Sequence, residues 1–313
     1  MSDYSVELRG VTKAFDGHLA VDDVSFAIRS GTAFGLLGPN GAGKTTTIRM
    51  MMNIIMPDSG EVRILGQSSM EEMKRRIGYL PEERGLYKRM KVIDQLTFLG
   101  EIRGLRASLA RTTAMGWLER LEIADWAPKK VEDLSKGMQQ KIQFIGCVIH
   151  DPDIIILDEP FSGLDPVNTR VLKDLFIEFR EMGKTLIFST HIMEQAEQLC
   201  DEIVLINRAR VVLNGTMGEI TRRYSGNKIM LRGSGETARL EKVDGVHSVE
   251  VKEDGVLIEL APETNRSDFL REATQVWNIE SAVPHEATLD EIFIQVVGAS
   301  VDAVERESSA GAK

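Results

Sequence analysis

Residues 38–45 have the sequence GPNGAGKT, which matches the phosphate-binding pattern G-x-x-x-x-G-K-[ST] at every defined position. An apolar run at 33–37 precedes the match and predicts a buried strand, and a stretch at 45–52 follows it and predicts a helix. Strand, glycine-rich loop and helix in this order are the context that the motif requires. Glycines let successive backbone N–H groups turn toward phosphate oxygens, and the helix N-terminus adds positive potential. The stretch therefore predicts an α/β fold with a phosphate site at this loop.

Two residues of the loop carry reactive groups. Lys44 can reach the β- and γ-phosphates as a point charge, and the Thr45 hydroxyl can ligate Mg²⁺. The alternative interpretation is a tight glycine-rich turn that binds nothing. The full match, in the required context, argues against that alternative.

A second motif has the sequence IIILDE at residues 154–159. Its four apolar residues predict a strand buried on both faces of a parallel sheet. Asp158 and Glu159 then emerge at the carboxyl edge, where ligands bind in open α/β sheets. We expect Asp158 to hold Mg²⁺ through water and Glu159 to polarise the attacking water as general base. An ordinary strand ending in solvated acids is the alternative, and the phosphate loop in the same chain makes it the weaker one.

Composition narrows the class of protein. The chain has 313 residues, 42% hydrophobic and 27% charged, which is typical of a globular protein with two domains. The most apolar runs, 144–149 and 154–157, are far shorter than the about 20 residues that span a bilayer. The first residues show no secretory signal. Cys147 and Cys200 lie far apart without metal-binding spacing, which favours two buried thiols in a reduced compartment.

The charge distribution argues against nucleic-acid binding. Net charge is −10, with 27 basic and 31 acidic residues up to residue 220 and 11 and 17 after it. Proteins that bind the phosphate backbone generally show a basic excess. We therefore expect no nucleic-acid partner.

The pattern of elements predicts two domains and a tail. Up to about residue 220 strands and helices alternate, which predicts a mainly parallel sheet covered by helices, with short strands also at 6–8, 24–28 and 62–65. A helical subdomain is expected at about 84–150, broken near Gly104. Residues 221–300 show the order β-α-β-β-α-β of a small ferredoxin-like α+β domain, followed by a helix at 288–297. Residues 301–313 are expected to form a flexible tail.

Residues 134–141, LSKGMQQK, resemble the signature usually written LSGGQ and begin shortly before the second motif. With this stretch, residues 6–218 resemble the ATP-binding subunit of an ABC transporter, a P-loop NTPase cassette with a mixed sheet and a helical subdomain. The resemblance implies that Ser135 and Gly137 face the γ-phosphate of ATP bound to a second subunit. Taken alone, the stretch is an ordinary helix N-cap.

Further positions match the family. Phe15 falls where the family stacks an aromatic ring on adenine, although a core phenylalanine is the alternative. The resemblance implies that residues 162–165, which end in Asp165, cross the dimer interface, and that His191 is the switch histidine near the γ-phosphate. The resemblance implies that the nucleotide contacts are Phe15, Gly38, Pro39, Asn40, Gly41, Ala42, Gly43, Lys44, Thr45, Thr46, Glu82, Ser135, Gly137 and Asp165. It implies that Glu159 and His191 are catalytic. It also implies that Thr45, Asp158 and Glu82 bind the metal ion.

Two positions depart from the family pattern. Glu82 stands where the family often has a glutamine that senses Mg²⁺ and the nucleotide and links to the membrane subunit; the Glu82 carboxylate can still ligate Mg²⁺. Lys136 replaces a signature glycine and either adds positive charge near the partner's phosphate or faces solvent. Both departures, with the small C-terminal domain, resemble the ABC-2-type exporters of sodium, antibiotics or other substrates.

The resemblance implies a function. ATP and Mg²⁺ are the expected cofactors, and two subunits, identical or related, are expected to close around two ATP molecules. Hydrolysis would power a separate integral-membrane permease, which places the chain in the cytoplasm, on the cytoplasmic face of the membrane. A basic region is expected to dock there, or else forms a solvated face; it consists of Arg84, Lys88, Arg89 and Lys91, with Arg103, Arg106 and Arg111 a little further on. The alternatives are a soluble ABC ATPase acting on ribosomes or nucleic acid, and a small-molecule P-loop kinase.

Overall fold

The computed structural model describes residues 3–66, 75–83 and 85–298 and divides into two compact units, Met1–Gly215 and Thr216–Lys313. We call them the N-terminal unit and the C-terminal unit. The expected tail at 301–313 and the basic residue Arg84 lie outside the described residues. Within the described ranges, no helix is both long enough and apolar enough to cross a membrane.

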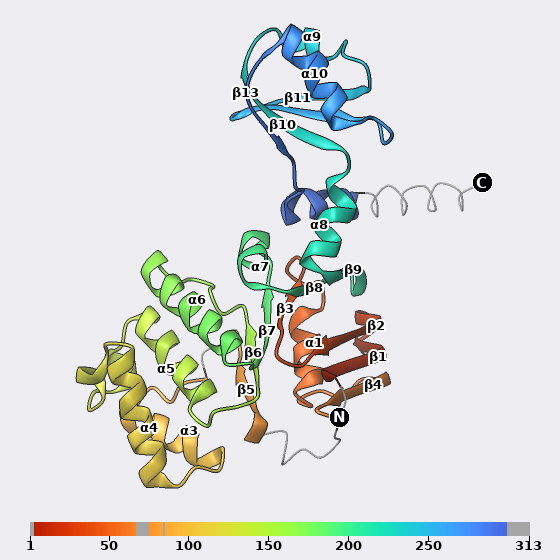
Figure 1. Cartoon of the computed structure of the whole chain (residues 1–313). Coiled ribbons are helices and arrows are strands. Elements are labelled where there is room, and N and C mark those ends of the chain that lie inside the picture. Colours follow the sequence, from red (N-terminus) through yellow and green to blue (C-terminus); the bar gives the residue numbers. More distant parts are fainter. Residues whose placement is uncertain (1–2, 67–74, 84, 299–313) are drawn as a thin grey trace. The chain divides into compact units, whose positions relative to one another are not determined.

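A six-stranded sheet with the order β5-β6-β7-β3-β8-β9 forms the centre of the N-terminal unit (Figure 1). Its strands are β3 (Ala33–Leu37), β5 (Ile77–Leu80), β6 (Ile154–Asp158), β7 (Thr185–Thr190), β8 (Glu202–Asn207) and β9 (Arg210–Thr216). The pairs β5–β6, β6–β7, β7–β3 and β3–β8 are parallel. Every residue of β3, β6 and β7 is buried, as expected for strands covered on both faces. The predicted central strands are confirmed.

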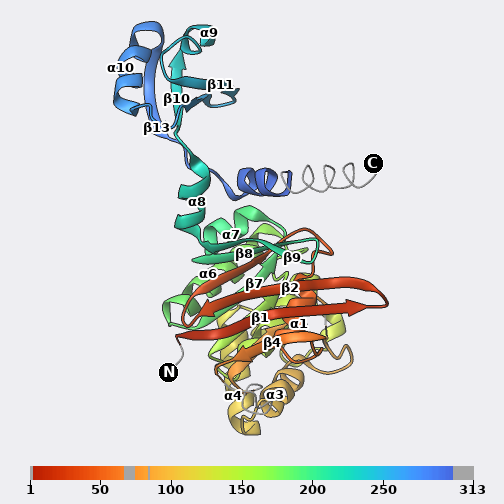
Figure 2. The ribbon, with the colours of Figure 1, turned by 90° about the vertical axis from the view of Figure 1, so that its right-hand side faces the viewer.

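A separate antiparallel sheet with the order β2-β1-β4 packs in the same unit (Figure 2). Its strands are β1 (Tyr4–Phe15), β2 (His18–Arg29) and β4 (Ser59–Ile64). The strands predicted at 6–8, 24–28 and 62–65 correspond to parts of β1, β2 and β4, but β1 and β2 are longer than predicted. The register shifts along β1, for example between Leu8 and Val11, and such bulges interrupt the alternation by which a long strand is found in a sequence.

Helices surround the two sheets. They are α1 (Lys44–Met51), α3 (Val92–Ile102), α4 (Ala107–Arg120), α5 (Lys136–Val148), α6 (Pro166–Glu181) and α7 (Met193–Leu199), with short 3₁₀ turns at Ala124–Trp126 and Val131–Asp133. α1 contacts β2, β4 and β6, so it joins both sheets in one core. α3 and α4 lie together at one end of the unit (Figures 1 and 2), and Gly104, at φ 99°, separates them. Cys147 and Cys200 are free and buried, as predicted.

The C-terminal unit contains a four-stranded antiparallel sheet with the order β11-β12-β10-β13. Its elements are α8 (Met217–Ser225), β10 (Lys228–Ser234), α9 (Thr237–Leu240), β11 (Val246–Lys252), β12 (Gly255–Leu260), α10 (Arg266–Val276) and β13 (Asn278–Pro284), followed by helical residues 289–298. This order, around a core that includes Leu231, Ile258 and Phe269, confirms the ferredoxin-like prediction. β9 and α8 lie outside the elements predicted from the sequence.

Candidate nucleotide site

The phosphate loop connects β3 to α1, and its glycines are required by the space around them. Gly38 has φ 147°, and a Cβ there would lie 2.1 Å from the Ile206 carbonyl oxygen. Gly43 has φ 111°, and a Cβ would lie 2.4 Å from the Ala20 carbonyl oxygen. Because any larger residue would collide with rigid backbone, the loop can hold this tight path only with glycine at both positions.

Lys44 is 6% exposed and folds back over the loop. Its Nζ donates to the carbonyl oxygens of Gly38 at 2.8 Å and Pro39 at 3.2 Å. The same Nζ lies 3.3 Å from Glu159 Oε1, and the Glu159 side chain is only 10% exposed. The cation is therefore held above the loop by two carbonyls and one carboxylate. A phosphate arriving in the loop would compete with that carboxylate for Lys44.

Asp158 ends β6 and is 1% exposed. Its Oδ1 accepts hydrogen bonds from Ser189 Oγ at 2.6 Å and from Thr45 Oγ1 at 3.3 Å. Burial raises the pKa of Asp158, although the two hydroxyl donors act in the opposite direction. Its Oδ2 is buried and has no hydrogen-bond partner among the described residues. An unsatisfied buried carboxylate oxygen beside a threonine hydroxyl suits a hard cation such as Mg²⁺.

Thr45 and Asp158 can also be compared with the way in which proteins usually hold Mg²⁺ at nucleotide sites. No group of three or more His, Cys, Asp or Glu residues that could hold a metal ion occurs in the described part of the chain. Mg²⁺ in nucleotide sites is usually bound by one or two protein oxygens together with phosphates and water, rather than by a protein cage. Thr45 and Asp158 fit that pattern.

Glu159 occupies an unusual backbone conformation. Its φ is 48°, in the left-handed region that residues with a side chain rarely adopt. Its N–H donates to Ser189 Oγ at 2.9 Å, and each of its carboxylate oxygens lies 3.1 Å from His191 Nδ1. The carboxylate thus lies between Lys44 and His191. Eight other described non-glycine residues also have a positive φ, so the contacts with Lys44 and His191, rather than the backbone conformation, distinguish Glu159.

A cavity of about 280 Å³ opens above the phosphate loop. Its lining residues are Ala20, Pro39, Asn40, Gly41, Gly43, Lys44, Thr45, Thr46, Glu82 and Glu159. Glu82 comes from the segment after β5, so the structure brings it together with the phosphate loop. Ala20 was missed by sequence reasoning, because nothing in its local sequence distinguishes it. Gly38 and Ala42 belong to the loop itself but do not line the cavity.

Phe15 lies outside that lining, at the end of β1, and its ring is 43% exposed. Lys13 Nζ lies 5.5 Å from the ring centroid, and Lys13 also pairs with Asp58 at 2.6 Å. The alternative of a core phenylalanine is therefore wrong. An exposed ring beside a hairpin turn is available for stacking on a planar group.

The signature stretch lies beside the loop at residues 162–165. Ser135 caps α5, with its Oγ accepting from the Met138 N–H at 3.3 Å. Asp165 caps α6, accepting from the Asn168 N–H at 2.9 Å, and this bond lowers the pKa of the Asp165 carboxyl. A Cβ on Gly137 would lie 2.6 Å from Asn168 Nδ2, so the two helix starts are in contact. None of Ser135, Gly137 and Asp165 lines the phosphate-loop cavity of its own chain.

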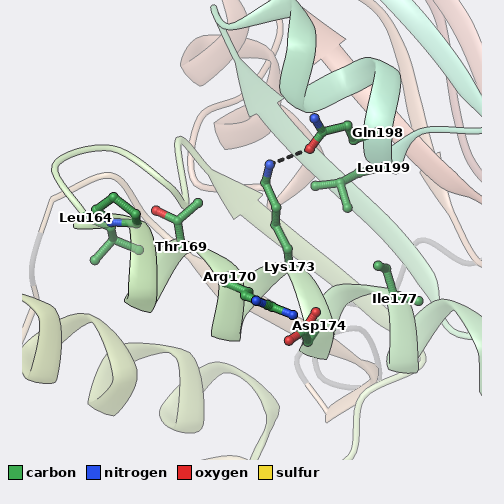
Figure 3. Close-up of a pocket in the computed structure, with 9 residues that line it drawn as sticks. Leu164, Thr169, Arg170, Lys173, Asp174, Ile177, Gln198 and Leu199 are labelled. Carbon is green, nitrogen blue, oxygen red and sulfur yellow. Dashed lines mark hydrogen bonds between the residues drawn. The ribbon is translucent and has the colours of Figure 1, made fainter.

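A second cavity of about 560 Å³ lies between α6 and α7 (Figure 3). Leu164, from the loop before α6, lies at one side of it, and Lys173 Nζ donates to Gln198 Oε1 at 2.6 Å across it. Leu199 and Ile177 form an apolar part of the cavity wall (Figure 3). The hydrogen bond between Lys173 and Gln198 therefore links α6, which follows Asp158 and Glu159 in the chain, to α7, which follows His191.

The fold and the site define a P-loop nucleotide-binding protein, and comparison with known proteins identifies its family. Residues 21–162 match the family described as ABC transporter. Residues 215–297 match the family described as ATP-binding protein DrrA1-3-like, C-terminal domain.

Curated relatives match along nearly the whole chain. The uncharacterized ABC transporter ATP-binding protein YhaQ of Bacillus subtilis (strain 168) is 40% identical, over 92% of this chain and 97% of its own length. The daunorubicin resistance ATP-binding protein DrrA3 of Streptomyces coeruleorubidus is 31% identical, over 95% and 97%. A solved structure of an ATP-binding subunit of an ABC transporter is 29% identical with a TM-score of 0.65, covering 70% of this chain and 92% of that one.

The chain belongs to the family of ABC transporter ATP-binding proteins. It is accordingly an ATP-binding ATPase.

Proposed function

We propose that two copies of this chain, or one copy and a related ATPase, close around two ATP molecules and so power export by a separate membrane permease. One observation carries the proposal. The phosphate-loop cavity of a single chain is lined by Lys44, Thr45 and Glu159 but by none of Ser135, Gly137 and Asp165. A second subunit would bring its own Ser135 and Gly137 against the γ-phosphate and complete the site.

The residues on the phosphate-loop side have separable roles in the proposed hydrolysis. Thr45 and Asp158 would hold Mg²⁺, with Glu82 close by at the same cavity, and the bound ion would neutralise phosphate charge. The phosphates would draw Lys44 away from Glu159 and leave that carboxylate free. Glu159 would then take a proton from the attacking water, whose oxygen bonds to the γ-phosphorus as the bond to ADP breaks. His191 would hold Glu159 through Nδ1.

The proposed dimer would close because its closed state binds ATP more tightly than its open state does. ATP would contact Lys44 of one subunit and Ser135 of the other, so the closed dimer binds the γ-phosphate better than the open state does. Hydrolysis removes that bridge and releases the subunits. Asp165 would act indirectly, because its carboxylate caps α6 and fixes the start of that helix beside Gly137.

The dimer can be tested with Glu159→Gln, which should bind ATP without hydrolysing it. Light scattering after gel filtration should show a dimer with ATP and Mg²⁺ and a monomer with ADP. A Glu159→Gln, Lys44→Ala double variant is the control, because it keeps the surface but loses the phosphate contact. A monomer under all conditions would contradict the proposed closure.

Attachment to a permease is proposed for the face around α3 and α4. Tyr87 is 55% exposed, and its ring meets Phe98 edge-on at 5.9 Å. Lys88, Arg89 and Lys91 are exposed beside them. The expected basic run is shorter than predicted, since Arg111 pairs with Asp94 at 3.4 Å and Arg103 is half-buried. Apolar rings flanked by exposed cations suit a membrane protein's cytoplasmic segment near anionic lipid.

This attachment predicts that the Lys88→Ser, Arg89→Ser, Phe98→Ser variant loses membrane recovery while its ATP turnover in solution is unchanged. Changing Arg239 and Lys242 of the C-terminal unit to serine is the charge control. Equal recovery of the two variants with membranes would refute the assignment. Copurification with ribosomes, instead of a membrane protein, would favour a soluble ABC ATPase.

The names of the relatives support export as the direction. They include daunorubicin resistance, linearmycin resistance and Nod factor export proteins. We assign the ATP chemistry to a cassette ending near residue 220 and an accessory role, in dimer contact or regulation, to residues 221–300. The location proposed is the cytoplasmic face of the cell membrane.

A further inference from the structure

Ser189 is a fully buried serine in β7 whose hydroxyl contacts both acidic residues that end the neighbouring strand. Its Oγ lies 2.6 Å from Asp158 Oδ1 and 2.9 Å from the backbone nitrogen of Glu159. The N–H of Glu159 can only donate, so Ser189 Oγ is the acceptor there. The single hydroxyl proton is then free for Asp158 Oδ1, and both hydrogen bonds have an assigned direction.

Each bond fixes a different feature of the site. The bond from Glu159 holds a backbone turn at φ 48°, which directs the Glu159 carboxylate between Lys44 and His191. The bond to Asp158 uses Oδ1 and so leaves Oδ2 as the buried oxygen that has no hydrogen-bond partner in the described part of the chain. Thr45 also bonds Oδ1, but at 3.3 Å and with a hydroxyl that is itself a proposed metal ligand. Ser189 is thus the contact to Asp158 that does not depend on the metal.

We propose that Ser189 is a positioning residue for ATP hydrolysis, which orients Asp158 toward the metal position and fixes the turn that places Glu159. This inference rests on the proposed roles of Asp158 and Glu159. Ser189 itself touches neither nucleotide nor metal in this proposal. No local pattern indicates the role, because a serine two residues before His191 at the end of an apolar strand looks like any strand-end hydroxyl.

Ser189→Ala tests the inference through the coupling between Mg²⁺ and ATP. The affinity for ATP is measured with Mg²⁺ and again in EDTA. In the unaltered protein Mg²⁺ should strengthen binding; in Ser189→Ala we expect that strengthening to fall by about tenfold, since a charge-assisted hydrogen bond is lost. Binding in EDTA should stay within about twofold, because the phosphate loop is untouched. We also expect kcat to fall by about tenfold or more.

Thr185→Val is the matched control. Thr185 is buried in the same strand, and its hydroxyl accepts the Gly31 N–H at 2.9 Å, as Ser189 accepts that of Glu159. Its loss should lower the melting temperature and leave the Mg²⁺ effect intact. Equal loss of the Mg²⁺ effect in both variants, or full retention in Ser189→Ala, would overturn the inference.

Asp158→Asn separates this inference from the proposed function. If Asp158→Asn loses the Mg²⁺ effect while Ser189→Ala retains it, Asp158 holds the metal and only the role of Ser189 is wrong. If Asp158→Asn retains the effect too, the proposed metal assignment fails and the inference fails with it.

Discussion

Replacing Glu159 with glutamine should make ATP bind more tightly even before any hydrolysis is measured. Lys44 Nζ and Glu159 Oε1 lie 3.3 Å apart, and the two side chains are 6% and 10% exposed. At an effective dielectric constant near 20, this pair attracts by about 5 kcal/mol. When ATP binds, its phosphates have to replace the Glu159 carboxylate as the partner of Lys44. Glu159→Gln removes the charge that competes with the phosphates.

Most of the attraction offsets the desolvation of the two charges, as in other buried pairs. Lys44 also keeps its bonds to the Gly38 and Pro39 carbonyls. We therefore expect about a quarter of this attraction energy to appear in the free energy of ATP binding, which corresponds to roughly tenfold tighter binding of ATP. Hydrolysis should fall by roughly 100-fold or more in the same variant, because the general base is lost.

The assay is titration of a fluorescent ATP analogue in EDTA, which removes the metal from the comparison. Glu82→Gln is the control, because it removes the same charge from the same cavity without an ion pair to Lys44 among the described contacts. It should tighten binding by less than about threefold, through reduced repulsion alone. If Glu159→Gln binds ATP no tighter than Glu82→Gln does, the competition described for Lys44 is refuted.

Three further predictions concern the phosphate loop, the exposed Phe15 ring and the half-buried His150 imidazole. Gly38→Ala should destabilise the N-terminal unit by about 3 kcal/mol or more in denaturant unfolding, since its Cβ meets the Ile206 carbonyl, whereas Gly17→Ala, in open space at φ 82°, should cost about 1 kcal/mol. Phe15→Ala should weaken ATP binding about tenfold with an unchanged melting temperature, and Phe15→Tyr should restore binding. Burial and the charge of Arg103 lower the pKa of His150 from 6.5 to about 4. Because the unfolded chain therefore takes up a proton at higher pH than the folded chain does, the free energy of unfolding should decrease as the pH falls from 6.5 toward 4. His150→Gln should flatten that dependence in thermal melts at several pH values.

Much of the fold could be predicted because its central strands are locally distinctive. β3 and the first four residues of β6 are short apolar runs, and β7 has apolar residues at 186–188 between polar ends. β1 was found only in part, because its bulges break the alternation on which detection depends. α8 carries a capping box between Thr216 and Glu219, and that signal could have found it.

The candidate site, too, could be predicted from the sequence only in part. Lys44, Thr45, Asp158 and Glu159 follow from motifs whose backbone context fixes where the side chains emerge. The ion pair between Lys44 and Glu159, and the two bonds of Ser189, depend on three strands meeting at one edge. Such contacts are non-local, and no spacing within the chain indicates them.

The central claim, that each ATP site is shared by two subunits, is tested most directly by mixing two inactive variants. Lys44→Ala removes the phosphate loop's cation, and Ser135→Glu places a negative charge on the signature side. If the site is composite, neither variant hydrolyses ATP alone, but their mixture recovers roughly a quarter of full turnover, because half of the dimers hold one intact site. If each site is complete within one chain, Ser135→Glu hydrolyses ATP by itself, because Ser135 lies outside the cavity of its own chain, and mixing with Lys44→Ala adds no activity; that result would contradict the shared site.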